Sequence, residues 1–312
     1  MKIGLDIMGG DFAPRATVLG AIAALPSLAA DQKLVLIGDK DVALAILKEN
    51  NCDPDNFGFV HTTEVIGMGE HPAKAIVQKP DSSISVGFKL LKEGEIQAFS
   101  SAGNSGAMLV GAVLSIKTIE GVLRPAITSI IPQTTGALGV LVDVGANADC
   151  KPEYFPQFGI LGSLFAQYVY NIARPRVGLI NIGEEEGKGN ALYQAAYPLL
   201  KANTLINFVG NIEGRNACEG DADVFVCDGF TGNVILKLAE SFYDIAIKRN
   251  IKDSFFDMFN YEQYGGSPIL GVNAPVLVGH GISTPEAIKN MVILSKNMVE
   301  SSLTEKIKLA FQ

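Results

Sequence analysis

Cysteine, histidine and positive charge are all scarce in this sequence. Its 312 residues include four cysteines and three histidines, and the formal net charge is −8 at pH 7. The cysteines form no CxxC pair and show no metal-ligand spacing, so we expect reduced, mostly buried thiols, no bound metal and a cytoplasmic protein. The acidic balance argues against nucleic acid as a partner, because a phosphate backbone needs a concentrated basic surface.

Long apolar runs are missing too. No stretch of about 18 or more uninterrupted apolar residues is present, so we expect no membrane-spanning helix. The apolar start at residues 1–6 is too short for a signal-peptide core and is typical of a first β-strand. The composition, 48% hydrophobic and 19% charged, is typical of a globular α/β protein. With no internal repeat or linker, the sequence predicts a single α/β chain over residues 1–312, in which any two lobes belong to one continuous fold.

The common nucleotide and hydrolase motifs are also absent. Residues 183–188 superficially resemble a phosphate-binding P-loop, but the glycine spacing is short and the acidic run would repel phosphate. The first predicted strand is followed by MGGD at residues 8–11 rather than by GxGxxG, so the dinucleotide fingerprint is missing. There is no GxSxG elbow, and the histidines show no arrangement that marks a serine or cysteine nucleophile. We therefore expect no ATP cradle, no hydride transfer and no cofactor.

Short apolar runs bounded by turn residues alternate with helix-length segments, a pattern typical of strands buried on both faces. We predict strands at residues 3–7, 34–37, 57–61, 96–99, 127–131, 139–142, 177–180, 208–209, 224–227 and 276–278. We predict helices at residues 16–25, 42–48, 83–93, 107–116, 158–171, 192–200, 234–249 and 286–300. The alternation predicts an open, largely parallel α/β sheet with helices on both faces and ligand loops at the strand ends.

Small residues gather in three of these loops. Residues 100–106, Ser-Ser-Ala-Gly-Asn-Ser-Gly, lie between a predicted strand and a helix-length apolar run. Small residues let the backbone turn sharply and leave its N–H groups uncovered, as an anion-binding helix N-terminus requires. Similar residues follow two other predicted strands, at 143–147 and 228–233. One such loop could simply cap a helix, but three of them predict one shared phosphate site.

Ordered motifs along essentially the whole chain resemble those of the bacterial phosphate acyltransferases. They are LDIMGGD at residues 5–11, SAGNSG at 101–106, RPA at 124–126, VDVGAN at 142–147, NIGE at 181–184, KGN at 188–190, GNIEG at 210–214, CDGFTGN at 227–233, YGG at 264–266 and HG at 280–281. The resemblance implies transfer of a long-chain fatty acyl group from acyl-acyl carrier protein to orthophosphate, giving acyl phosphate for phospholipid biosynthesis. It also implies a homodimer with an isopropylmalate-dehydrogenase-like or phosphotransacetylase-like fold, working in the cytoplasm at the inner membrane surface.

Such a reaction mainly requires phosphate to be held in line with a thioester carbonyl while the developing oxyanion is stabilised. The backbone amides of residues 103–106, with the Asn104 and Ser105 side chains, are our first choice for binding phosphate or the oxyanion. The candidate catalytic residues are Asn104, Lys188, His280 and Asp228. Lys188 has an alternative role in neutralising the acidic residues 184–186, and His280 has one as a histidine satisfied by backbone hydrogen bonds.

The candidate binding residues are aspartates, glycines and small polar residues at predicted strand ends, where open α/β sheets bind ligands. They are Asp6, Gly9, Gly10, Asp11, Ser101, Gly103, Ser105, Gly106, Asp143, Asn147, Asn190, Gly232 and Asn233. Each aspartate or asparagine could instead cap a helix or shape a turn.

Residues 250–264 predict an excursion that faces a membrane or a dimer partner. Ile251, Phe255, Met258 and Phe259 follow i, i+4, i+7, i+8 spacing, with Phe256 beside them and with Lys248, Arg249 and Lys252 nearby. An apolar stripe flanked by cations is typical of an interfacial helix. Burial in a dimer interface is at least as consistent with the same stripe.

Two other functions are compatible with the sequence. One is a phosphotransacetylase-like enzyme that uses acyl-CoA in place of acyl-acyl carrier protein. The other is a non-catalytic module that binds acyl groups or carrier protein and has lost turnover.

Overall fold

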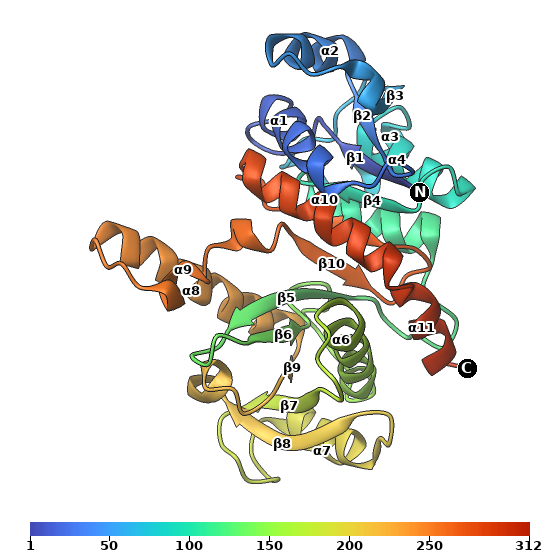
Figure 1. Ribbon diagram of the computed structural model, residues 1–312. Helices are drawn as coiled ribbons and strands as arrows, with labels where there is room; N and C mark the ends of the chain where they lie inside the picture. Colours follow the sequence, from blue (N-terminus) through green and yellow to red (C-terminus); the bar gives the residue numbers. More distant parts are fainter. The chain divides into compact units, whose positions relative to one another are not determined.

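The computed structural model describes residues 1–312, which divide into two compact units (Figure 1). Unit 1 comprises Met1–Thr118 and Tyr261–Glu300, and unit 2 comprises Ile119–Asn260 and Ser301–Gln312. Each unit therefore combines segments that are far apart in the sequence, as the colours in Figure 1 make visible.

Unit 1 contains strands in the order β3-β2-β1-β4-β11-β10. Neighbouring strands are parallel except for the antiparallel pair β10 and β11. Most of these strands are apolar and buried, which matches their reading as strands covered on both faces. Their bounds are β1 (Lys2–Asp6), β2 (Lys33–Gly38), β3 (Phe57–His61), β4 (Ala98–Ser101), β10 (Ser267–Leu270) and β11 (Val276–Val278).

The helices of unit 1 follow its strands along the chain. They are α1 (Arg15–Ala24), α2 (Lys40–Glu49), α3 (Pro72–Gln78), α4 (Ser83–Glu93), α5 (Ser105–Gly111), which continues as a π-helical segment (Ala112–Ile116), and α10 (Pro285–Glu300). Side chains of Asp39 and Ser82 cap α2 and α4, as expected for these residue types. Helices α1 and α10 pack closely, because a Cβ atom on Gly20 would lie only 2.5 Å from the Cβ of Ile288.

Unit 2 contains strands in the order β5-β6-β9-β7-β8. Strands β5 and β6 are antiparallel, and the other neighbours are parallel. The strands are β5 (Ala126–Pro132), β6 (Leu138–Val142), β7 (Arg176–Asn181), β8 (Asn207–Glu213) and β9 (Val224–Val226). The helices are α6 (Tyr154–Val169), α7 (Ala191–Ala202), α8 (Gly229–Lys248), α9 (Ser254–Asp257) and α11 (Leu303–Ala310). Short 3-10 turns occur at Leu25–Ser27, Pro54–Asn56, Gly214–Cys218 and Tyr261–Gln263.

The segment with the predicted apolar stripe is packed against unit 2. Phe259 is 4% exposed and belongs to a core cluster with Phe225 and Leu236. Its ring lies 5.1 Å from that of Phe255 and 5.3 Å from that of Phe242. The prediction that Phe259 faces a membrane or a partner is therefore wrong, because this side chain holds α9 and the chain after it against α8.

The predicted α/β class and largely parallel strand arrangement are confirmed. Strand β10 and helices α3, α9 and α11 were not predicted. Helix α8 begins at Gly229 rather than at residue 234, because the Asp228 side chain caps it and the glycine-containing segment forms its first turn. None of the helices combines the length and the apolar character that a bilayer crossing requires.

Candidate active site

The loop after β1 is organised by the carboxylate of Asp6. This side chain is fully buried, and it accepts hydrogen bonds from the Met8 amide at 2.8 Å and from the Ser101 hydroxyl at 2.6 Å. Burial raises the pKa of Asp6 above its usual range, although hydrogen bonds from Ser101, Ser83, Met8 and Gly9 oppose the shift. Asp6 therefore ties the turn after β1 to the end of β4.

Glycine lets that turn approach the loop after β4. A Cβ atom on Gly9 would lie 2.5 Å from Asp6 Oδ2 and 2.6 Å from the Gly103 nitrogen, so a larger residue would force a shift. The Gly103 amide in turn donates to the Ser101 hydroxyl at 2.9 Å. The structure thus brings together four predicted binding residues from two loops.

The loop after β11 joins the same cluster. The Asp11 amide donates to the Gly281 carbonyl at 2.7 Å, and a Cβ on Gly10, which has a φ of +109°, would lie 3.2 Å from that oxygen. The ring of His280 lies 4.6 Å from the ring of Tyr261. Because β1, β4 and β11 are neighbouring parallel strands, their carboxyl ends meet at one edge of the sheet. Gly10, Asp11 and His280 all lie there.

Asn104 has a structural role in this cluster. Its Oδ1 accepts from the Ala107 amide at 3.0 Å, which caps α5. Its Nδ2 donates to the carbonyl oxygens of Gly67, Met68 and Glu70 at 3.1, 3.2 and 3.0 Å. The side chain is buried and is fully engaged by these contacts, so a catalytic role for Asn104 stays a prediction.

The start of α5 provides unpaired donors in the same cluster. Ser105 and Gly106 are the first residues of the helix, and their amide N–H groups have no acceptor in the structure. Unpaired amides in a first helical turn carry partial positive charge and are suited to an anion. A phosphate group at this edge would therefore meet backbone donors rather than a cluster of basic side chains.

A second buried aspartate organises the carboxyl edge of the unit 2 sheet. The Asp143 carboxylate accepts from the amides of Ile127 at 2.9 Å, Gly145 at 3.3 Å, Ala146 at 3.2 Å and Asn147 at 2.6 Å. It also accepts from the Asn147 side chain at 3.0 Å. Burial raises the pKa of Asp143, and these hydrogen bonds oppose the shift. The loop after β6 is closed around its own carboxylate.

The first turn of α8 packs directly on that loop. A Cβ atom would lie 2.7 Å from Asp143 Oδ2 if placed on Gly229, and 1.9 Å from the Asp143 carbonyl oxygen if placed on Gly232. The Asn233 side chain donates to the Val144 carbonyl at 3.1 Å. Because β6 and β9 are parallel neighbours, the predicted loops at 143–147 and 228–233 meet at one edge.

Asp228 caps α8 and is bound by a tyrosine that sequence reasoning missed. Its Oδ1 accepts from the Thr231 amide at 2.9 Å, and its Oδ2 accepts from the Tyr193 hydroxyl at 2.6 Å and the Thr231 hydroxyl at 2.8 Å. Burial raises the pKa of Tyr193 above its usual range. The one signal in the sequence was a tyrosine on the buried face of a predicted helix.

Lys188 and Asn190 border a loop that two buried amides hold in place. Asn181 Nδ2 donates to the Lys188 carbonyl at 3.2 Å, and Asn211 Nδ2 donates to the Glu185 carbonyl at 2.8 Å. The Lys188 ammonium lies 3.5 Å from the Glu185 carboxylate, and the Asn190 side chain caps α7. Lys188 thus pairs with its acidic loop and Asn190 caps a helix, which are the structural roles that the sequence also allowed. Contact of either residue with the substrate stays a prediction.

The three small-residue loops divide between the units. Residues 100–106 lie in unit 1, whereas residues 143–147 and 228–233 lie in unit 2. Two of the loops are therefore brought together within one unit. The prediction that all three form one site stays a prediction.

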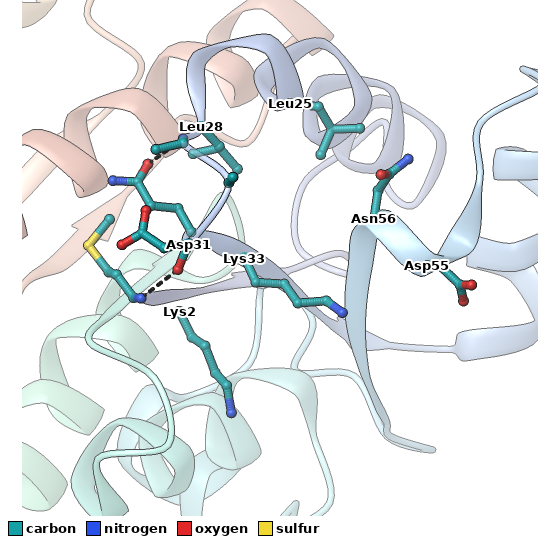
Figure 2. A pocket seen from close by; sticks show the side chains of 11 residues that line it. Lys2, Leu25, Leu28, Asp31, Lys33, Asp55 and Asn56 are labelled. Carbon is teal, nitrogen blue, oxygen red and sulfur yellow. Dashed lines mark hydrogen bonds between the residues drawn. The ribbon is translucent and has the colours of Figure 1, made fainter.

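A cavity of about 570 Å³ lies at the other edge of the unit 1 sheet, by the amino ends of β1 and β2 (Figure 2). Cations and carboxylates line it together, from Lys2 and Lys33 and from Asp31 and Asp55. The Met1 ammonium donates to the Asp31 carbonyl at 2.9 Å. This mixture of charges favours no single class of ligand, and the cavity is separate from the Asp6 cluster.

Comparison with known proteins identifies the family. A family model described as fatty acid synthesis protein matches residues 1–306. The phosphate acyltransferase of Dictyoglomus turgidum is 41% identical, covering 98% of this chain and 96% of that protein. That of Pelotomaculum thermopropionicum is 43% identical, covering 100% and 95%.

Solved structures share the fold at low sequence identity. A phosphotransacetylase from Streptococcus pyogenes matches with a TM-score of 0.69 at 16% identity, covering 96% of this chain and 94% of that chain. One from Staphylococcus aureus matches with a TM-score of 0.63 at the same identity and coverage. These structures support the fold alone, whereas the sequence relatives carry the identity: the chain belongs to the phosphate acyltransferase family of enzymes.

Proposed function

We propose that this enzyme transfers a long-chain acyl group from acyl-acyl carrier protein to orthophosphate, giving an acyl phosphate for phospholipid synthesis. The observation that carries the proposal is the edge of unit 1, where the Asp6 carboxylate joins the loops after β1 and β4 and the loop after β11 binds the Asp11 amide. There the amides of Ser105 and Gly106 are free to bind an anion, and the family membership favours phosphate as that anion.

In the proposed reaction, phosphate is the nucleophile and the protein supplies position and charge stabilisation. A phosphate oxygen attacks the thioester carbonyl, and the carbonyl oxygen becomes an oxyanion. The tetrahedral intermediate then collapses, the new C–O bond is retained, and the C–S bond breaks to release a thiolate. Donors at the start of α5 hold the phosphate or the oxyanion, so no covalent enzyme nucleophile is needed.

We assign the proton for the departing thiolate to His280. Its backbone lies at the end of β11, where the carbonyl accepts from the Ser283 hydroxyl at 2.6 Å. The neighbouring Gly281 carbonyl binds the Asp11 amide, which fixes this loop against the Gly10 turn. Histidine is the side chain that enzymes use most often as a general acid or base, which supports this assignment.

A purified-protein assay tests the donor and the acceptor together. Palmitoyl-acyl carrier protein, or palmitoyl-CoA in a parallel reaction, is mixed with the protein with or without phosphate. The free thiol released from the donor is measured. We expect thiol release only when phosphate is present. If only palmitoyl-CoA reacts, the donor assignment is wrong. If neither donor turns over, a non-catalytic acyl or carrier-protein binding module replaces the proposed enzyme.

We also infer that the enzyme is a homodimer that uses α8. Phe230, Val234 and Leu238 follow i, i+4, i+8 spacing on this helix, and they are 67%, 53% and 60% exposed. Residues with this spacing share one helix face, and an apolar face left open in a water-soluble fold is typical of a contact surface. A second copy of the chain would cover it, whereas contact with a membrane surface is the alternative.

Sedimentation velocity distinguishes these two occupants. Leu238→Glu places a charge in the apolar face and should shift the protein from dimer to monomer. Leu309→Glu, on an exposed residue of α11, is the matched control and should leave the dimer intact. A monomeric wild-type protein that pellets with anionic liposomes, and loses pelleting in Leu238→Glu, would replace the dimer with membrane contact.

A further inference from the structure

Unit 2 contains a cavity of about 370 Å³ that is separate from its glycine loops. The second half of α6 forms one wall, and the segments that lead into β7 and β8, with Ala310 at the end of α11, form the others. Because β6, β9, β7 and β8 are parallel, the amino ends of β7 and β8 lie at the edge opposite Asp143 and Asp228. The volume is within the range that small-molecule sites occupy.

A buried hydroxyl in the cavity wall has no partner within the protein. Ser163 is 7% exposed, and its Oγ makes no hydrogen bond. A buried hydroxyl normally has a hydrogen-bond partner, because losing its bonds to water without replacement costs free energy. The Oγ has almost no exposed surface, so the Ser163 side chain must rotate toward the cavity before a polar group of a ligand becomes its partner.

The mouth of the cavity carries a cation without a counter-ion. Arg174 lines the cavity, and no carboxylate pairs with it or contributes to the lining. The nearby Arg176, in contrast, is paired with Asp223 at 2.8 Å. Arg174 also has a φ of +50° directly before Pro175, a backbone conformation that is rare for a side-chain-bearing residue.

The remaining wall has a polar and an apolar part, and Gln167, Thr204 and Asn207 supply the polar side chains. Ile160 and Leu164 come from α6, and Leu205 and Ile206 come from the segment before β8. Leu205 is 61% exposed, which leaves apolar surface open beside the charged group of Arg174. A wall that combines apolar side chains, polar side chains and a single cation fits a molecule that has an apolar body and an anionic head.

We propose that this cavity binds a single-chain amphiphile with an anionic headgroup. The chain would lie against Ile160, Leu164 and Leu205, and the headgroup would pair with Arg174 while a polar atom bonds Ser163. Helix α6 also packs on β6 and β9, since a Cβ on Gly162 would lie 2.6 Å from Val224 Cγ1. The ligand would therefore contact the helix that supports the strands leading to the Asp143 and Asp228 loops.

Isothermal titration of the full chain with octanoate, octyl phosphate and octanol tests the proposal. We expect saturable binding of one or both anions and at least tenfold weaker binding of the neutral alcohol. The two anions decide between a carboxylate and a phosphate headgroup. Absence of saturable binding by either anion, or equal binding of octanol, would overturn the proposal.

Variants locate the binding. Arg174→Gln and Leu205→Asp should each raise the Kd of the bound anion at least tenfold, whereas Arg215→Gln, on an exposed arginine elsewhere in unit 2, should not change it. Ser163→Ala should raise the melting temperature of the free protein and weaken anion binding severalfold, a combination that a purely structural serine would not produce. Unchanged Kd values in Arg174→Gln and Leu205→Asp would place the binding elsewhere and refute the assignment.

Discussion

The buried aspartates of the two units lie at strand ends but organise their surroundings differently. Asp143 accepts five hydrogen bonds, and these close its loop around the carboxylate. Asp6 ties two loops together, while the amides of Ser105 and Gly106 in the adjoining loop remain unpaired. Similar aspartate and glycine residues thus give a closed turn in unit 2 and an open row of donors in unit 1. Only the open row is suited to bind an anion.

The largest effect on stability is expected where the first turn of α8 packs against the Asp143 loop. Gly232→Ala would place a Cβ 1.9 Å from the Asp143 carbonyl oxygen, and a backbone atom cannot move away easily. We expect a loss of about 3 kcal/mol in the free energy of unfolding, measured by urea denaturation. Gly214→Ala is the control, because nothing lies within 4 Å of the added atom. Equal stability of the two variants would contradict the tight packing of α8 on the Asp143 loop.

A smaller loss of stability is expected when either of two helix-capping asparagines is removed, and its size should differ between them. Asn104 caps α5 and also binds three carbonyl oxygens, whereas Asn190 is an exposed residue that caps α7. We expect Asn104→Ala to cost about 2–3 kcal/mol of unfolding free energy, because buried carbonyls lose their donor, and Asn190→Ala about 1 kcal/mol.

Kinetics of the same variant test the predicted catalytic role of Asn104. We expect Asn104→Ala to raise the KM for phosphate strongly, because the unpaired amides at the start of α5 depend on this cap for their position. Asn104→Asp keeps the capping oxygen but turns a carboxylate oxygen toward the three carbonyls and adds a negative charge, so it should raise the KM for phosphate as well. An unchanged phosphate saturation curve in Asn104→Ala would remove this residue from the site.

The positions of most strands along the chain and the loops at their ends could be predicted from sequence, whereas the order of the strands in the sheet could not. Buried parallel strands are apolar runs, and the small residues that follow β1 and β4 show where the backbone turns sharply. Helix α9 could not be predicted as observed, because it is a single turn whose apolar stripe turns inward at Phe259. The direction in which an apolar side chain points here depends on how it packs against α8, and the spacing of apolar residues in the sequence gives no information about that packing.

The contacts within the site were less predictable than its location. Aspartates at strand ends could be expected to meet glycine loops, and Asp6 and Asp143 do so. The bond between Tyr193 and Asp228 depends on how α7 lies beside α8, and the two residues are 35 positions apart. The capping role of Asn104 was an open alternative, but its three carbonyl partners come from a loop without a distinct sequence signal.

The pH dependence of stability should distinguish the two buried carboxylates, Asp6 and Asp143. Burial raises the pKa of Asp6 and Asp143 above 3.8, the usual aspartate value. Between that pH and the higher folded pKa, the folded state binds more protons than the unfolded state, so wild-type stability falls as pH rises. The stability of Asp6→Asn relative to wild type should therefore increase from about pH 4 upward and then level off.

Comparison with Asp143→Asn sharpens this result. In Asp143→Asn, the new side chain has one acceptor oxygen for the five donors that bind Asp143. We therefore expect the free energy of unfolding to fall by roughly a further 1–2 kcal/mol at every pH. Urea denaturation across the pH series measures both terms. A stability difference for Asp6→Asn that does not change with pH would contradict the effect of burial on its carboxylate.

The smallest effect on stability is expected at Lys188, and it tests whether unit 2 contributes a cation to phosphate binding. The pair of Lys188 with Glu185 is solvent-exposed, so Lys188→Met should change the free energy of unfolding by less than about 0.5 kcal/mol. Lys201→Met, which removes a comparable exposed pair with Glu186, is the matched control. If Lys188 lies over phosphate, its variant raises the KM for phosphate about tenfold while the control does not, because a positioned charge near an anion contributes on the order of 1 kcal/mol. Identical phosphate saturation in the two variants would assign Lys188 to neutralising its own acidic loop, and anion binding would then rest on the open donors of unit 1.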